Sequence, residues 1–206
     1  YEKEENNKIM IGILSSVVGT YNKESREHIL HIRIATQMLL RRLVEKTDAY
    51  PLTESDIHLI ATASSLHDIG KVGISKDVLN KPTKLTDEEF EIMKTHTLIG
   101  AKMIENMEYP SDKPLVKTAY EICRWHHERF DGNGYPDGLK GNEIPISAQV
   151  VSIADAFDAL TSTRVYKNAY DYRMAIQMIM DGKCGCFNPL LLECLKEMGA
   201  KIYVAF

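Results

Sequence analysis

The chain has 206 residues, of which 44% are hydrophobic and 26% charged, and its formal net charge is −4. These values are typical of a soluble globular protein with one substantial domain, and the negative charge argues against a surface for a nucleic-acid polymer. The four cysteines form neither a CxxC pair nor a dense disulfide set, which favours reduced thiols in a cytoplasmic protein. No membrane segment is expected, because the longest apolar stretch, residues 9–19, is too short to span a bilayer.

Helical periodicity dominates the sequence, with no convincing run of alternating strands. In chain order, helices are expected over residues 3–19, 24–46, 53–66, 86–107 with a break near His96, 114–126, 147–163, 172–181 and 189–198. Thr53 and Thr86 carry N-terminal capping signals, Pro114 suits a first helical position, and Ser147 is a predicted N-cap. We therefore expect an all-α fold with a single domain.

The N-terminal segment 1–23 is expected to be helical and to stand apart from the domain at 24–206. The chain begins at Tyr1 without an initiator Met, so we expect this helix to be a linker to a missing upstream domain.

Several histidines lie on or at the ends of predicted helices near carboxylates. Glu24 and His28 are four residues apart and share a helix face, although a solvated pair is the commoner interpretation of such a spacing. His67 ends an apolar stripe and precedes Asp68, which also fits a buried core histidine followed by a capping aspartate. His96 as a surface residue and His126 as a core residue stay open at this point.

Two carboxylates in a largely apolar segment change the balance between these alternatives. Asp155 and Asp158 fall on a helix expected to be buried, where carboxylates are costly unless they are paired with cations. Imidazole and carboxylate donors without thiolate clusters are typical of a site for two or three metal ions. Bridging carboxylates let neighbouring ions share one activated water.

Four motifs in order strengthen the metal hypothesis: "HDIGK" at 67–71, "KTH" ending at His96, "HHERFDGNGYPDGLKG" at 126–141 and "IADAFDALTSTRVY" at 153–166. Together they resemble the HD-GYP subgroup of the HD phosphohydrolase superfamily over Glu24 to Leu195. The resemblance implies an all-α HD-type domain with a metal cluster in the core of the bundle. The metal ligands it implies are Glu24, His28, His67, Asp68 as the bridging carboxylate, His96, His126, His127 and Asp155. It implies two or three divalent ions, and Glu24 points to the third. Mixed nitrogen and oxygen ligands suit iron or manganese, while zinc or nickel could also occupy the site.

The same resemblance implies a phosphodiesterase that hydrolyses cyclic di-GMP to pGpG or GMP through a metal-activated hydroxide. Asp68 and Lys71 would be catalytic, Lys71 and Arg164 would contact phosphate, and Asp158 would support a ligand or contact substrate. Tyr135 and Pro136, in a glycine-rich loop, would shape the substrate cleft. His31 stands where many members carry Arg.

The implied partners are domains of the GGDEF (diguanylate cyclase) or receiver type, and a homodimer through the first helix is a further expectation. Three alternatives for the function stay open. They are a phosphodiesterase for another cyclic dinucleotide such as 3′,3′-cyclic GMP-AMP, a catalytically silent module that senses the nucleotide or docks a partner, and a general HD-type nucleotide hydrolase.

Overall fold

The computed structural model describes residues 26–107, 113–162 and 169–206. Within these ranges every regular element is a helix, and the β-type pairing is limited to an isolated bridge between Lys183 and Gly185. The expected helix 3–19 and the predicted site residues Glu24 and Arg164 lie outside the described residues. The all-α fold class is confirmed for the described part of the chain.

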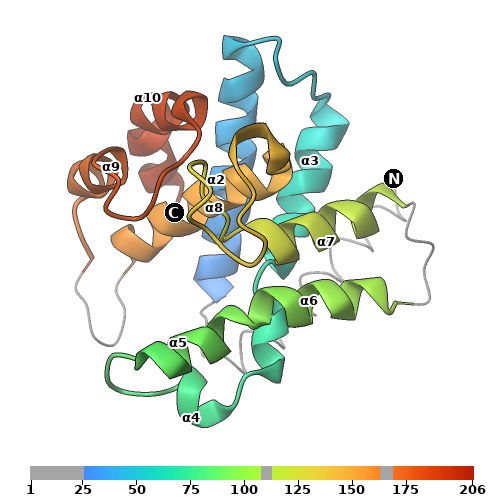
Figure 1. The fold of residues 1–206 in the computed structure, drawn as a ribbon. Coiled ribbons are helices and arrows are strands. Elements are labelled where there is room, and N and C mark those ends of the chain that lie inside the picture. Colours follow the sequence, from blue (N-terminus) through green and yellow to red (C-terminus); the bar gives the residue numbers. More distant parts are fainter. Residues whose placement is uncertain (1–25, 108–112, 163–168) are drawn as a thin grey trace.

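The described helices are labelled in chain order in Figure 1, and a long segment without regular structure, residues 126–140, separates α7 from η3. The α-helices are α2 (Arg26–Lys46), α3 (Glu54–Ala63), α4 (Lys76–Leu79), α5 (Asp87–Lys94), α6 (His96–Glu105), α7 (Pro114–Trp125), α8 (Ile146–Thr161), α9 (Tyr172–Met180) and α10 (Pro189–Ala205). The 3₁₀ turns are η1 (Ser64–Leu66), η2 (Ile69–Gly73) and η3 (Gly141–Glu143).

Helix α8 runs through the middle of the bundle, and α2, α7, α9 and α10 pack around it (Figure 1). Most of its residues are buried, including Val151 and Phe157. The stripe on α2 that contains Ile32 and Leu39 is fully buried against it and its neighbours, as expected for apolar residues at steps of three and four. Because α8 also carries Asp155 and Asp158, the hydrophobic core brings two carboxylates into the interior.

The capping signals define the helix starts that the sequence predicted. Thr53 and Thr86 each accept a hydrogen bond from the backbone N–H three residues later, and in both cases the acid at that position accepts one in return. The predicted break near His96 is confirmed, because α5 ends at Lys94 and α6 begins at His96.

Two predicted boundaries are wrong. Ser147 is not the N-cap of α8, because the helix begins at Ile146 and Pro145 occupies the capping position. The Ser147 hydroxyl instead donates to Glu121 Oε2 at 2.9 Å, so a tertiary partner replaces the local one. The last helix extends to Ala205 rather than ending near 198, since Ile202 continues its buried stripe.

A close backbone approach joins η2 to the start of α6. A Cβ on Gly70 would overlap the backbone carbonyl oxygen of His96 and the backbone nitrogen of Gly100. Only glycine allows this separation, and the approach carries the Asp68 backbone towards His96. Among the described residues, no helix combines the length and the apolar character needed to cross a membrane.

Candidate metal centre

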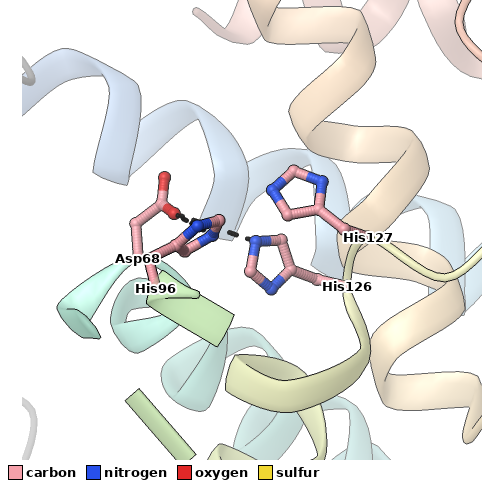
Figure 2. Close-up of side chains that lie close together, drawn as sticks. All are labelled: Asp68, His96, His126 and His127. Atoms are coloured by element: carbon pink, nitrogen blue, oxygen red, sulfur yellow. Dashed lines mark ion pairs between the residues drawn. The ribbon is translucent and has the colours of Figure 1, made fainter. Parts of the chain in front are cut away.

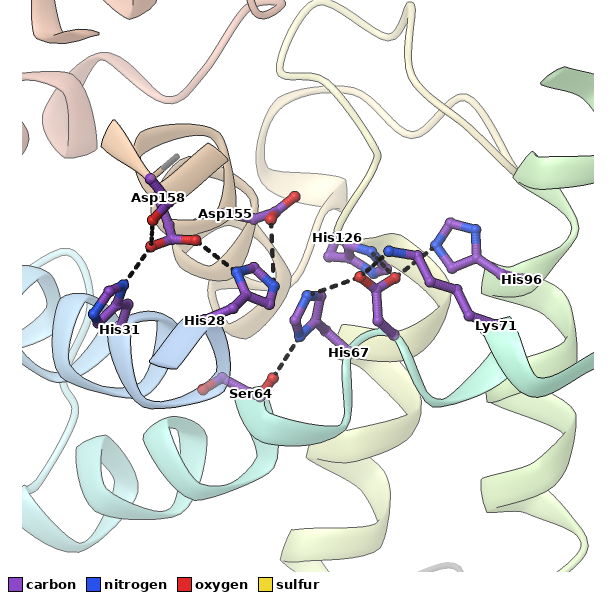
Figure 3. Close-up of polar contacts among 11 residues, drawn as sticks. His28, His31, Ser64, His67, Lys71, His96, His126, Asp155 and Asp158 are labelled. Atoms are coloured by element: carbon purple, nitrogen blue, oxygen red, sulfur yellow. Dashed lines mark hydrogen bonds and ion pairs between the residues drawn. The ribbon is translucent and has the colours of Figure 1, made fainter. Parts of the chain in front are cut away.

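The fold brings seven of the predicted metal ligands together in two neighbouring groups. The first group contains Asp68, His96, His126 and His127, and the second contains His28, His67 and Asp155. Within each group, one potential ligand atom from every member lies within 4.8 Å of the others. The ligands come from α2, the turn between η1 and η2, the start of α6, the end of α7 and α8 (Figures 2 and 3).

Asp68 connects the two groups through its two carboxylate oxygens. Its Oδ1 lies 3.2 Å from His96 Nε2 and 3.8 Å from His126 Nε2, while its Oδ2 lies 3.2 Å from His67 Nε2. Two ligands bound side by side to one transition-metal ion, at about 2.0–2.1 Å each, are about 3 Å apart. The separations around Asp68 therefore suit a carboxylate that bridges two ions.

Backbone carbonyl groups fix the orientation of three imidazoles. His67, His96 and His126 each place Nδ1 at 2.7–2.9 Å from a main-chain oxygen in the preceding turn, and the acceptors are Ser64, Met93 and Ile122 respectively. A carbonyl oxygen accepts only, so Nδ1 carries the proton and Nε2 keeps its lone pair. This arrangement is typical of histidines that bind a metal through Nε2.

Buried polar atoms face the centre without a hydrogen-bond partner. Nε2 of His96, Nε2 of His126 and Oδ1 of Asp68 are all buried, and no described residue forms a hydrogen bond with them. Such atoms are costly in a protein interior unless something else satisfies them. A divalent cation suits the position, because all three atoms can donate a lone pair and Asp68 Oδ1 lies 3.2 Å and 3.8 Å from the two nitrogens (Figure 2).

Burial disfavours the protonated form of the two adjacent histidines, His126 and His127. Burial is the main cause that lowers the pKa of His126 to about 3, and neighbouring His67 lowers it further. Burial likewise holds the pKa of His127 well below its ordinary value, followed by the proximity of His126 and His96. Neutral imidazoles have the free lone pair that metal binding requires.

Asp68 is ionised despite its burial. Desolvation is the largest influence and would raise its pKa, but the ammonium group of Lys71 and the electrostatic contact with His67 act in the opposite direction and hold the pKa well below the usual value. Lys71 Nζ donates to Asp68 Oδ2 at 2.6 Å, which places an ammonium group at the edge of the cluster (Figure 3). A carboxylate suited to bridging two ions and an ammonium group that could meet an anionic ligand are thus adjacent.

Asp158 lies behind His28 rather than at the open side of the centre. Its carboxylate accepts hydrogen bonds at 2.6 Å from Nδ1 of His28 and Nδ1 of His31, and Ser162 donates to it at 2.8 Å. Burial would raise the pKa of Asp158, but its bonds with these partners lower it overall. The carboxylate is 1% exposed, so the geometry favours the ligand-supporting role over substrate contact.

Sequence reasoning gave His31 no role beyond its place in the family pattern. The structure joins its ring to Asp158 and stacks it on Phe206 at a centroid separation of 4.1 Å. A carboxylate such as Asp158 on a buried helix is expected to have a hydrogen-bond partner. The sequence could not identify His31 as that partner, because the two residues are 127 positions apart.

The glycine-rich loop is held against the centre by Glu128, another residue whose role the sequence did not reveal. Its Oε1 accepts the backbone N–H groups of Asp137 and Gly138 at 2.7 and 3.0 Å. A Cβ on Gly134 would overlap the backbone of Glu128, so this glycine is required for the close return of the loop. The loop thereby stacks Tyr135 on His127, with ring centroids 4.8 Å apart. In the sequence, the position of Glu128 directly after His126 and His127 was the one sign of a role near the metal centre.

The wall behind the cluster contains the thiol of Cys123. Its Sγ donates to the Leu66 carbonyl oxygen at 3.1 Å, and burial raises the pKa of the thiol well above its ordinary range. A thiol that stays protonated is a poor metal ligand. The donors in the two ligand groups are therefore nitrogen and oxygen.

Comparisons with known proteins agree with this geometry. The sequence model of the HD domain family matches residues 8–185. A probable cyclic di-GMP phosphodiesterase of Vibrio cholerae is 40% identical over 184 residues, which are 87% of this chain and 42% of that protein. A 3′3′-cGAMP-specific phosphodiesterase of the same organism is 35% identical over 193 residues, covering 94% of this chain and 35% of that protein. The chain thus spans less than half the length of these relatives.

A solved structure shares the fold. The crystal structure of a cyclic GMP-AMP-specific phosphodiesterase of V. cholerae matches with a TM-score of 0.68 over 97% of this chain and 50% of that chain, at 17% sequence identity. This likeness extends over nearly the whole helical arrangement. Together with the family match over most of the sequence, it confirms the resemblance that the motifs indicated. The chain belongs to the HD domain family.

Proposed function

We propose that this domain is a metal-dependent phosphodiesterase that hydrolyses cyclic di-GMP to linear pGpG, to GMP, or to both. The observation that carries the proposal is the position of Asp68, whose two oxygens face separate groups of nitrogen and oxygen donors. Two ions held side by side, as a bridging carboxylate allows, can stabilise both the attacking and the leaving oxygens in the hydrolysis of a phosphodiester. The names of the V. cholerae relatives support the same reaction class.

In this proposal, one set of residues binds the metal ions and another contacts the substrate. His96, His126, His127 and Asp68 would hold one ion, and His28, His67 and Asp155 would hold another with the shared help of Asp68. Glu24 stays a predicted ligand for a third. Bound divalent cations would supply positive charge for the phosphoryl oxygens and lower the pKa of water towards about 7.

Substrate contacts in the proposal come from the rim of the centre. The ammonium of Lys71, 2.6 Å from Asp68, would neutralise charge that develops on a non-bridging phosphate oxygen. Arg164 is predicted to do the same for the phosphate. Tyr135 and Pro136 would border the cleft, because the loop holds Tyr135 against His127. Contacts with GGDEF-type or receiver domains, and a homodimer, remain predictions.

A second candidate substrate is 3′,3′-cyclic GMP-AMP. It is favoured by the 35% identical relative that is named for this nucleotide. Both substrates have a ring of two phosphodiesters and differ in one purine, so the metal chemistry is common to both.

The direct test is turnover by the 206-residue chain under anaerobic conditions, with iron, manganese and zinc supplied in turn. Chromatography should show cyclic di-GMP converted to pGpG or GMP, and Asp68→Ala should lose both turnover and bound metal. Cyclic GMP-AMP and cyclic di-AMP are assayed in parallel. A chain that binds no metal and hydrolyses none of these nucleotides would instead be a silent sensing or docking module.

A further inference from the structure

Helix α5 carries a large exposed aromatic side chain next to the metal centre. Phe90 is 47% exposed, although α5 lies beside the folded core at the edge of the domain (Figure 1). Its ring meets Tyr135 edge to face, with centroids 6.3 Å apart and an interplanar angle of 86°. Tyr135 in turn stacks on His127. A continuous series of rings therefore leads from a candidate metal ligand to an exposed phenyl group.

Lys94 lies in the angle between the two outer rings. Its Nζ is 5.7 Å from the Phe90 centroid and 5.7 Å from the Tyr135 centroid. Within the described residues its ion pair is with Glu91, at 2.7 Å, and the Glu91 side chain is 68% exposed. An ion pair in water contributes little, so the ammonium can turn towards a ligand. Phe90, Tyr135 and Lys94 together form a corner with two aromatic rings and one cation.

The chemistry of the corner suits a purine base, and guanine in particular. Nucleobases stack on aromatic side chains through their π-faces. Guanine presents the two acceptors O6 and N7 on one edge, whereas adenine presents an amino donor in place of O6. An ammonium group donates hydrogen bonds and accepts none. Lys94 would therefore stabilise guanine against the rings and disfavour adenine.

We propose that Phe90, Lys94 and Tyr135 form a base subsite that binds one guanine of a cyclic dinucleotide while its phosphate occupies the metal centre. The inference rests on the proposed function and extends it, because it assigns the residues that select the base. Phe90 and Lys94 are new to the site, whereas Tyr135 was predicted only as part of the cleft border.

The test compares Phe90→Ala and Lys94→Met with Ile92→Ala in steady-state kinetics on cyclic di-GMP, cyclic di-AMP and methyl 4-nitrophenyl phosphate. Ile92 is the matched control, because it lies on the same helix and is 46% exposed. Phe90→Ala should raise KM for cyclic di-GMP about tenfold, as expected for loss of one stacked base. Its effect on kcat and on the small ester should be several times smaller. Lys94→Met should reduce the preference for cyclic di-GMP over cyclic di-AMP.

The outcomes separate this inference from the proposed function. If the wild-type chain cleaves the small ester but no cyclic dinucleotide, the proposed function fails and the subsite fails with it. If the wild-type chain turns over cyclic di-GMP and Phe90→Ala keeps the same KM, or Ile92→Ala raises KM equally, the subsite alone is overturned. An unchanged nucleotide preference in Lys94→Met overturns the selection of guanine.

Discussion

Asp68 and Lys71 form an ion pair 2.6 Å long at the edge of the cluster, yet their expected roles differ. Asp68 presents both oxygens to imidazole nitrogens, so its removal would take a ligand from both groups. Lys71 contributes a charge and no lone pair when it is protonated. The pair therefore allows metal binding and substrate binding to be separated by substitution.

Lys71→Ala should lower turnover of cyclic di-GMP about a hundredfold, in line with the loss of one group that stabilises the transition state. Metal content should stay near that of the wild-type chain, because no ligand atom is removed. Turnover and metal analysis of the same preparation provide the check, with the exposed Lys102→Ala as a control. Loss of metal together with activity would contradict this division of roles.

His31 should influence the second ligand group without touching an ion. It donates to Asp158, which accepts from His28 through the other carboxylate oxygen. Substitution of such supporting residues weakens metal affinity about 10–100-fold, and we expect His31→Ala to do so at the site of His28. Calorimetric metal titration would measure it. His58→Ala is the control, since His58 belongs to neither group, and equal affinities in wild type and His31→Ala would refute the role.

At the scale of elements, the approach of η2 to α6 sets the distance between Asp68 and His96. Gly70→Ala should lower the free energy of unfolding by about 1–3 kcal/mol, because a methyl group would push backbone atoms apart. Metal affinity should fall as well. Gly73→Ala in the same turn is the matched control, since its methyl group would meet only the Ile99 side chain, which can move. Thermal unfolding compares the two, and equal melting temperatures would disprove the steric argument.

Across the whole molecule, bound ions would tie together helices that are distant in sequence. Removing them with a chelator should lower Tm by about 5–10 °C if the ions are present at about a hundred times their Kd. Asp68→Ala, with its bridging ligand gone, should show a much smaller change in Tm on chelation. Differential scanning calorimetry measures both, and a wild-type Tm that ignores the chelator would contradict the ligand assignment.

The sequence predicted what depends on local pattern. The capping boxes at Thr53 and Thr86 and the apolar stripe of α2 involve residues within a few positions of each other. The helix starts and the buried face could therefore be predicted from the sequence. Much of the ligand set came from the family resemblance, because the carboxylates and histidines alone left a core interpretation open. The assignment of Ser147 failed because a distant partner, Glu121, competed with the local cap.

Contacts that depend on tertiary packing were beyond the reach of the sequence. The bond between His31 and Asp158 spans 127 positions, and the approach of Gly70 to His96 requires the final placement of two helices. The pairing of Phe90 with Tyr135 is of the same kind. Each joins residues that no periodicity or spacing relates.

The two ways in which the imidazoles are oriented make the two halves of the cluster unequal under mutation. His67, His96 and His126 form hydrogen bonds with main-chain oxygens. Every amino acid supplies such an oxygen, so a change of side chain at the accepting position would leave the orientation of these rings unchanged. His28 forms its hydrogen bond with the side chain of Asp158, so a single substitution at Asp158 would remove the bond that orients the His28 ring. Divergence among relatives should thus change or remove an ion-binding position at His28 more readily than one at His126.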